Sequence, residues 1–510
     1  MKIMQIKDEE KNSGKMEEGI QKPRIKIIDR KQMLLHPVEV EKLVPEYHEV
    51  RAIWEFVSHL DLSQYYGEIK SVEGEAGRAS WDPQLLISIW IYAYSKGISS
   101  AREISRLCEY DPAYQWLTGM EKINYHTLSD FRVYHYEALK ELFVEVLGVL
   151  SGEGLITMER VMHDGTKIKA YASGNTFRRE KRIEEYLKLA KEQVEQMEEM
   201  SEEEISLRIK KRRERAIREK KEKLELSLRE IEKIKARKNK KERGEIRVSI
   251  TDPEARIMKQ SDGGFAPSYN VQISTDDKNN VIVGVSVSQA ENDSGELVPA
   301  IEKMKENTGK MPKQIVVDGG YIKYGNILWT EEKGIKLIGN VGSSKSKTEG
   351  IYKSRGITSE FQLNKFIYDE RNNRYICPGG KILRYECKEE KVGTTKYRYR
   401  ASWKDCKICI YKNKCTSSKS NKGRAILINK EEAGIRKFKE EMGKEEIKAI
   451  YKRRGAVAEF PNAWIKSKFK VRQFVLQGLK KVEMESLWVS IAYNIKQWIR
   501  ICWKPQFVGC

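Results

Sequence analysis

Two aspartates, each next to an apolar run and followed by glycine, constrain the fold most strongly. Asp164 lies in the segment 160–167 (RVMHDGTK), and Asp318 lies in the segment 315–321 (IVVDGGY). Short apolar runs that end in a charge and glycine are typical of buried strands, so we expect each aspartate at the tip of a strand. Because ligands gather at strand ends in α/β sheets, the pattern predicts a site built on a sheet.

A third carboxylate, Glu459, lies in a basic stretch of helical character, residues 451–459 (YKRRGAVAE), and Lys466 follows seven residues later. Two strand-end aspartates and a helical glutamate are a suitable oxygen donor set for a divalent metal ion. The basic residues around them favour a phosphodiester substrate.

The chain has 510 residues, a net charge of +21 and a pI near 9.3. This charge favours a nucleic-acid partner over the alternatives of a ribosome-associated or an anionic-membrane protein. No apolar run approaches the roughly 20 residues of a spanning helix, and the charged first thirty residues do not resemble a secretory signal. We therefore expect a soluble, cytoplasmic protein with a disordered tail at 1–30.

The eight cysteines include a group in one region of the chain. Cys406 and Cys409 have the spacing of a metal hook, Cys415 is within reach, and Cys377 begins a Cys-Pro-Gly-Gly knuckle turn. We expect a structural zinc ion here, with Cys387 as an alternative to Cys377 and metal-free thiols as the alternative state. The scattered cysteines are expected to be free or buried thiols: Cys108, Cys387, Cys502 and Cys510.

Residues 34–131 have a helical pattern, with a helix start at Asp82-Pro83. Short helices are predicted over 101–107 and 124–132, and Arg132 is expected to be exposed. A helix-turn-helix that binds DNA and an ordinary helical bundle both fit this pattern.

Residues 178–245 are nearly all charged, with an apolar seam at heptad spacing from Ile183 to Met197. Ser201 and Glu204 resemble a capping box that starts a second helix. We expect a helical hairpin, which serves either as a dimer or DNA arm or as a solvated element without a partner. A coiled-coil scaffold is the wider alternative.

Strand signals follow this hairpin. Alternating apolar residues predict an antiparallel pair at 269–273 and 281–287, a helix at 294–307, and buried strands at 314–317 and 336–340. The fold class expected is α/β, a mixed sheet with flanking helices.

These motifs resemble the DDE transposases of bacterial insertion sequences, which have an RNase H-like catalytic fold. Residues 43–45 (LVP), 97–104 (GISSAREI) and 126–132 (HTLSDFR) are similar to the helical N-terminal domain of one large group. Asn124-Tyr125 stands where that group has Pro-Asp. Asp164 and Asp318 resemble the two catalytic aspartates of the family.

The family has a signature of the form Tyr-x2-Arg-x3-Glu-x6-Lys. The residues of this chain that resemble it in type and order are Tyr451, Arg454, Glu459 and Lys466. Here the gap between the arginine and the glutamate is four residues. Pro461 creates a Glu-x-Pro motif, which resembles a subgroup of the family that also has cysteines at a similar place in the chain. Tyr324 stands where a basic residue is common.

The resemblance implies a helical N-terminal domain at 31–145, which is a candidate for DNA binding. An RNase H-like catalytic domain is assembled from 155–177, 246–342 and 431–502. The helical hairpin is inserted at 178–245, and a Cys-rich insertion occupies 343–430.

The resemblance also implies a chemistry. Asp164, Asp318 and Glu459 would bind Mg²⁺ or Mn²⁺ for strand cleavage and transfer. Tyr451, Arg454 and Lys466 would contact phosphates of double-stranded DNA at the terminal inverted repeats. We expect a homodimer on DNA, associated with the bacterial nucleoid, and a structural role for His163. A catalytically silent DNA-binding descendant and an RNase H-like nuclease that cleaves without joining remain the alternatives.

Overall fold

The computed structural model describes residues 37–69, 79–199, 207–340, 352–391, 394–416, 422–429 and 432–507, together with residues 31, 33 and 350. The tail expected at 1–30, the capping box at Ser201 and the thiol of Cys510 lie outside these residues. No helix in the described part of the chain is both long and apolar enough to cross a membrane.

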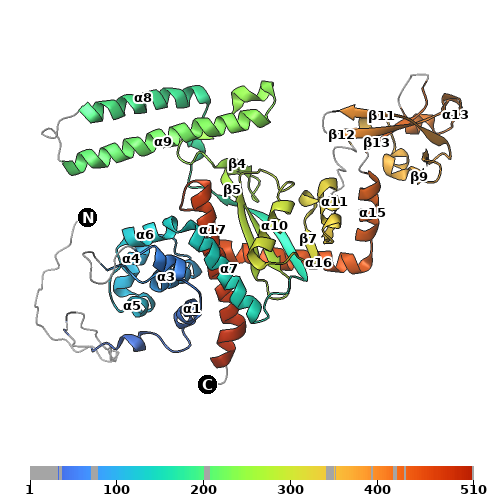
Figure 1. Ribbon diagram of the computed structural model, residues 1–510. Coiled ribbons are helices and arrows are strands. Elements are labelled where there is room, and N and C mark those ends of the chain that lie inside the picture. Colours follow the sequence, from blue (N-terminus) through green and yellow to red (C-terminus); the bar gives the residue numbers. More distant parts are fainter. Residues whose placement is uncertain are drawn as a thin grey trace, which may run out of the picture.

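A six-stranded mixed sheet occupies the middle of the molecule (Figure 1). The strand order is β4-β5-β1-β7-β8, and β6 pairs with β5. Strands β1, β7 and β8 are parallel, whereas β5 is antiparallel to β1, β4 and β6. The expected α/β class is confirmed. The strands are β1 (Arg160–Lys169), β4 (Arg256–Lys259), β5 (Phe265–Asp276), β6 (Ile282–Ser288), β7 (Gln314–Val317) and β8 (Lys336–Gly339).

The prediction that Asp164 ends a strand is wrong. Strand β1 continues five residues beyond it to Lys169, because β5 pairs with every residue from Val161 to Lys169. Asp318 does follow directly after its strand, where it caps the short 3-10 helix η4 (Gly319–Tyr321).

Helices cover both faces of the sheet. Helix α16 (Glu445–Ser467) crosses one face, where Val457 and Ala458 pack against Met162, Val316 and Ile338. Helices α10 (Leu297–Thr308) and α11 (Tyr324–Glu332) cover the other face, in a core that includes Val161, Ile315 and Val317. This alternation follows from the period of two along each strand.

The N-terminal helices and the C-terminal helix α17 (Leu479–Trp498) share one hydrophobic core, which also reaches β5 and β6. Asp82 caps the helix that begins at Pro83, as expected. The domain boundary near residue 145 stays a prediction. The helices are α1 (Glu49–Ser58), α2 (Ser63–Gly67), α3 (Pro83–Ser95), α4 (Ala101–Tyr110), α5 (Pro112–Thr118), α6 (Tyr125–Tyr134) and α7 (Tyr136–Gly152).

The expectation that Arg132 is exposed is also wrong, since only 5% of it is accessible. Its guanidinium lies 4.5 Å from the centre of the Trp90 ring and donates a hydrogen bond of 2.7 Å to the Ser99 carbonyl. A cation–π contact and a backbone acceptor replace the water that the charge loses.

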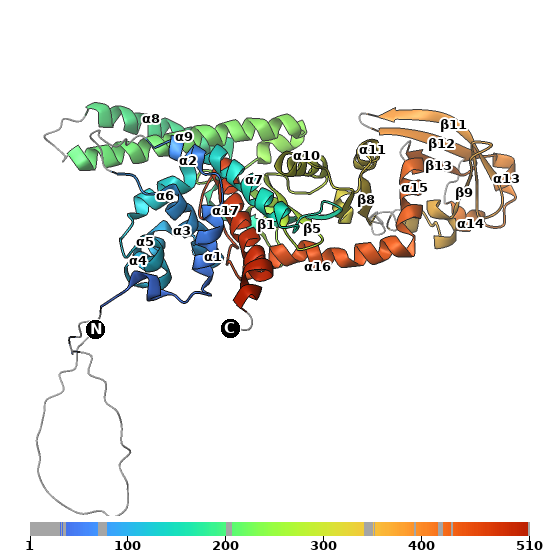
Figure 2. The same ribbon diagram turned by 60° about the horizontal axis from the view of Figure 1, so that its bottom comes forward.

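Two elements extend from the sheet in opposite directions (Figures 1 and 2). One is the antiparallel pair α8 (Glu180–Glu199) and α9 (Leu207–Arg237). The other is a five-stranded antiparallel sheet next to α15 (Glu432–Met442). Its strands are β9 (Ile367–Asp369), β10 (Arg374–Ile376), β11 (Ile382–Lys391), β12 (Thr394–Ala401) and β13 (Ala425–Asn429).

A buried carboxyl on α17 predicts a pH-dependent stability. Burial raises the pKa of Glu485 to about 7, despite the nearby Arg132 charge and hydrogen bonds from the backbone N–H groups of Val475 and Leu476. The folded pKa exceeds the unfolded value of about 4.3, so the stabilisation is complete below that pH and is lost as pH rises through about 7. We expect Glu485→Gln to remove up to roughly 3 kcal/mol of this pH dependence.

Urea unfolding across this pH window measures the effect. Glu145→Gln, a substitution at an exposed position of α7, is the matched control. Parallel stability profiles for the Glu485→Gln variant and the unmodified protein would contradict the prediction.

Candidate active site

Asp164 and Asp318 lie on neighbouring parallel strands and on the same face of the sheet. The paired positions Met162 and Val316 fix the register of β1 and β7, and each aspartate lies two residues further along its strand. Adjacent strands are about 4.8 Å apart, and a step of two residues keeps the face unchanged. Asp318 Oδ1 accepts a hydrogen bond of 2.6 Å from the Gly320 N–H, which fixes its orientation.

The carboxyl of Asp164 has a raised pKa, mainly because it is buried. Burial raises its pKa to about 6, although the Arg454 guanidinium opposes this effect, and the Asp318 carboxylate raises it further. A carboxyl with a raised pKa beside a second carboxylate gains stability from an added cation. The pair of hard oxygen donors fits Mg²⁺ or Mn²⁺ in its chemistry.

Helix α16 places two basic side chains on β1. Arg454 Nη1 lies 3.7 Å from Asp164 Oδ1 and is buried without a hydrogen-bond partner. Lys466 is half-buried and donates a hydrogen bond to Thr166 Oγ1, and burial lowers the pKa of its ammonium group. Buried donors of this kind normally have a hydrogen-bond partner, so Nη1 retains an unused hydrogen-bonding capacity beside Asp164.

Tyr451 and Glu459 also belong to α16. The Arg454 guanidinium lies 5.9 Å from the centre of the Tyr451 ring. Helix α16 runs without a break through Pro461, and Glu459 is exposed on it. In the described part of the chain, no group of three or more His, Cys, Asp or Glu side chains is arranged to hold a metal ion. The role of Glu459 therefore stays a prediction.

The opposite face of β1 carries a buried polar network. His163 forms hydrogen bonds with Ser274 (2.9 Å) and Gln272 (3.0 Å), and burial lowers its pKa to about 4. The Tyr321 hydroxyl donates a bond of 2.6 Å to Gln272 Oε1. The network therefore links β1 and β5 to the turn that carries Asp318, with a neutral His163 inside it.

Asp293 is the charged member of this network. It accepts hydrogen bonds from Asn270 (2.6 Å), Gln272 (2.9 Å) and Lys167 (3.3 Å). Burial raises its pKa, but these partners outweigh burial and hold the pKa below its usual value. Sequence reasoning missed this carboxylate. The available signal was the alternation of polar Asn270, Gln272 and Ser274 within a buried strand.

The four grouped cysteines line one small cavity of about 20 Å³ under the five-stranded sheet, which is room for about one ion or water molecule. Cys377 Sγ accepts a hydrogen bond of 3.3 Å from the Lys381 N–H, and Cys406 Sγ accepts one of 3.4 Å from the Arg424 N–H. Burial raises the pKa of Cys415 to about 11. Cys387 lies on β11 and is not among the lining residues.

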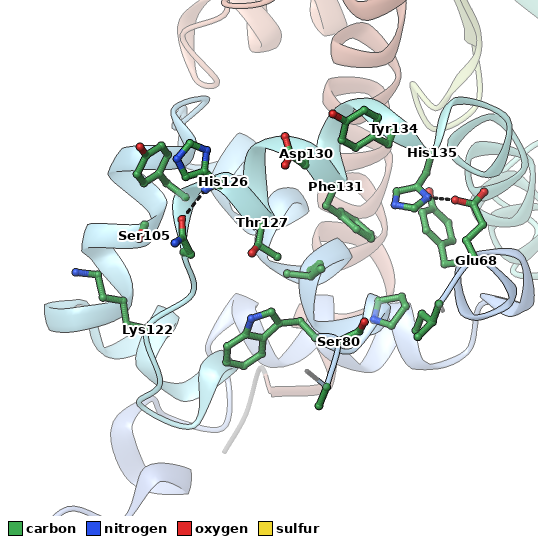
Figure 3. Close-up of a pocket in the computed structure, with 18 residues that line it drawn as sticks. Glu68, Ser80, Ser105, Lys122, His126, Thr127, Asp130, Phe131, Tyr134 and His135 are labelled. Atoms are coloured by element: carbon green, nitrogen blue, oxygen red, sulfur yellow. Dashed lines mark hydrogen bonds and ion pairs between the residues drawn. The ribbon is translucent and has the colours of Figure 1, made fainter. Parts of the chain in front are cut away.

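A larger cavity of about 950 Å³ lies beside α6 (Figure 3). Helix α6 contributes His126, Asp130 and Tyr134, which follow one another at intervals of four residues along the same face. His135 and Glu68 form a hydrogen bond of 2.6 Å at one end of the cavity. The cavity leaves this face of α6 accessible.

Two segments of the chain match known protein families. Residues 38–133 match a family described as "Transposase domain (DUF772)", and residues 376–499 match one described as "Transposase DDE domain". The second segment contains Tyr451, Arg454, Glu459 and Lys466, whereas the two aspartates lie between the matched segments. No curated protein matches the chain.

Both matched models describe transposase domains, one at each end of the chain. Together they support an insertion-sequence DDE transposase, and the predicted resemblance to this family is thereby confirmed. Members of this family generally use a divalent metal ion and act on DNA.

Gly165 provides a test of the network beneath Asp164. A Cβ atom at this position would lie 2.5 Å from both Asp293 Oδ1 and Gln272 Nε2. We expect Gly165→Ala to destabilise the protein by about 1–3 kcal/mol, because the network has to move. In contrast, Gly148→Ala places a methyl group in open space on helix α7 and is expected to stabilise by up to about 1 kcal/mol.

Urea unfolding of both alanine variants gives the comparison. A Gly165→Ala variant as stable as the unmodified protein would show that the network is not held against β1.

Proposed function

We propose that this transposase catalyses metal-dependent strand cleavage and transfer at the ends of an insertion sequence. The observation that carries the proposal is the pair Asp164 and Asp318, side by side on the face of the sheet that α16 covers. The family matches give the pair its context. The order of β6, β5, β1, β7 and β8, with three parallel strands and an antiparallel pair, supports an RNase H-like core.

In this proposal Asp164 and Asp318 hold the divalent metal, and Glu459 joins them when DNA is bound. A bound Mg²⁺ or Mn²⁺ ion supplies activation of the attacking water or 3′-hydroxyl and neutralisation of the leaving oxygen. The position of Asp164 beside Asp318 and the raised pKa of Asp164, which burial causes, support this assignment.

The basic residues of α16 position the phosphate. Arg454 has a buried Nη1 group without a hydrogen-bond partner, and a phosphate oxygen is the acceptor that suits it. Lys466 contacts Thr166, which lies two residues after Asp164 on β1. In this proposal its charge acts on the same phosphate as Arg454. The centre of the Tyr451 ring lies 5.9 Å from the Arg454 guanidinium, which is within reach of a cation–π contact.

The DNA partner in this proposal is double-stranded, at the terminal inverted repeats and at the target. The accessible face of α6 supports a contact between the N-terminal helices and DNA. A homodimer would bring two transposon ends together. We retain the division into an N-terminal helical domain, a catalytic domain, an inserted hairpin and a Cys-rich insertion as part of the proposal.

One observation favours a second candidate, a DNA-binding protein without catalytic activity. Glu459 is exposed, and within the described residues it does not form a metal-ligand group with the aspartates. The cleavage experiment below separates the two candidates.

Substitution of Asp318 tests the catalytic role. We expect Asp318→Asn to lower the rate of Mg²⁺-dependent cleavage by at least about 10²-fold, or about 2.7 kcal/mol, because one metal ligand is weakened. DNA binding without metal should remain. Cleavage of a duplex that carries the terminal sequence of the element measures the rate, with Asp262→Asn at an exposed loop as control.

An Asp318→Asn variant that cuts at the normal rate would remove Asp318 from the catalytic set. An unmodified protein that binds this duplex but never cuts it would favour the non-catalytic candidate.

We further propose that Cys377, Cys406, Cys409 and Cys415 bind a structural zinc ion. The shared cavity and the backbone N–H groups directed at two of the sulfurs support this. Among the described residues the four thiols are not yet arranged as a metal-ligand group, so zinc binding would draw them together. Metal analysis of the purified protein should find one zinc ion per chain. The double variant Cys406→Ser/Cys409→Ser should lose it, whereas Cys387→Ser should keep it. A zinc-free unmodified protein would refute the proposal.

A further inference from the structure

The distal half of the α8–α9 hairpin carries a concentrated positive charge. Residues 209–221 of α9 contain eight Lys or Arg residues and two glutamates. In the part of the chain that the structure describes, Arg212, Arg213 and Lys220 are exposed and have no acidic partner. The segment is about 18 Å long, a length over which duplex DNA carries roughly ten phosphates.

The proximal half of the hairpin is fixed firmly to the sheet. Glu230 is fully buried and forms ion pairs with Arg256 and with Lys233. Ser227 donates a hydrogen bond of 3.1 Å to the Ser249 carbonyl, and Lys223 donates one of 2.6 Å to Gln477. Strands β2 (Phe177–Arg178) and β3 (Val248–Ser249) pair at the base. The hairpin therefore holds its basic segment at a defined position.

We propose that the basic segment 209–221 is a binding surface for the sugar-phosphate backbone of duplex DNA, separate from the site on α16. The inference rests on the proposed function, because the DNA assigned to this surface is the DNA that the chain is proposed to cleave. Exposed Lys and Arg without acidic partners bind phosphate by releasing counterions, and they do so without reading the base sequence.

Charge complementarity favours DNA over a second copy of the chain. The facing part of α8, residues 192–199, contains four glutamates and no Lys or Arg, so a second hairpin offers only a short acidic stretch. Duplex DNA presents uniform negative charge along the whole segment. The two helices run side by side and extend beyond the sheet (Figures 1 and 2), and Arg212, Arg213 and Lys220 of α9 are exposed.

The test compares two triple variants with equal loss of charge. Arg212→Gln/Arg213→Gln/Lys220→Gln changes the distal segment, and Arg229→Gln/Arg237→Gln/Lys238→Gln changes exposed positions of the proximal part of the hairpin. Glutamine retains helix propensity, and circular dichroism checks that both variants fold. Fluorescence anisotropy of a labelled duplex of arbitrary sequence, without metal, gives affinity against salt from about 50 to 200 mM.

We expect the distal variant to reduce the magnitude of the slope of log K, where K is the DNA association constant, against log salt by about 2 to 3. Its affinity for the duplex at 0.1 M salt should fall on the order of a hundredfold. The proximal variant should change the slope by less than about 1. An unchanged slope in the distal variant, or equal losses in both variants, would overturn the proposal.

Light scattering addresses the alternative partner. A distal variant that loses dimer mass while it keeps the full salt slope would assign the surface to a second copy and overturn the proposal. Binding to this surface is measured without metal, whereas the catalytic proposal is tested by the cleavage rate of the Asp318→Asn variant. Failure of one proposal can therefore be distinguished from failure of the other.

Discussion

The parallel pairing of β1 with β7 is the constraint on which the site depends. The register that aligns Met162 with Val316 also aligns Asp164 with Asp318. Because side chains alternate between the two faces of a strand, both aspartates lie on the face that α16 covers. A shift of one residue would direct one aspartate into the polar network on the other side. Apolar contacts from Val457 and Ala458 then hold α16 where Arg454 can reach Asp164.

Strand β1 separates two kinds of polar environment. On one face, the carboxyl of Asp164 is buried beside Asp318, and the Nη1 group of Arg454 is buried with no hydrogen-bond partner. On the other face, Asp293 and His163 have several hydrogen-bond partners each. Several hydrogen bonds to each of these groups make that network rigid, whereas the Arg454 donor retains capacity for an acceptor. The rigid face therefore supports the reactive one.

Sequence reasoning located the strands that have strong apolar runs, including β7 with its terminal Asp318. It placed Asp164 at a strand tip because Gly165 and Lys167 lack apolar character, yet pairing with β5 extends the strand. It missed the burial of Arg132, because the Trp90 ring that receives this cation is distant in sequence. Asp293 escaped notice because it lies in a loop, and only tertiary contacts give it partners.

The shared core of the N-terminal helices and α17 has a consequence for protein synthesis. Helices α1 to α7 leave the ribosome more than 300 residues before α17, yet residues such as Trp488 and Ile491 complete the apolar core that those helices form. Until α17 emerges, the early helices keep part of their apolar surface exposed to water. The DNA-contact region proposed for α6 therefore reaches its final structure only after the catalytic sheet and α16 have been translated.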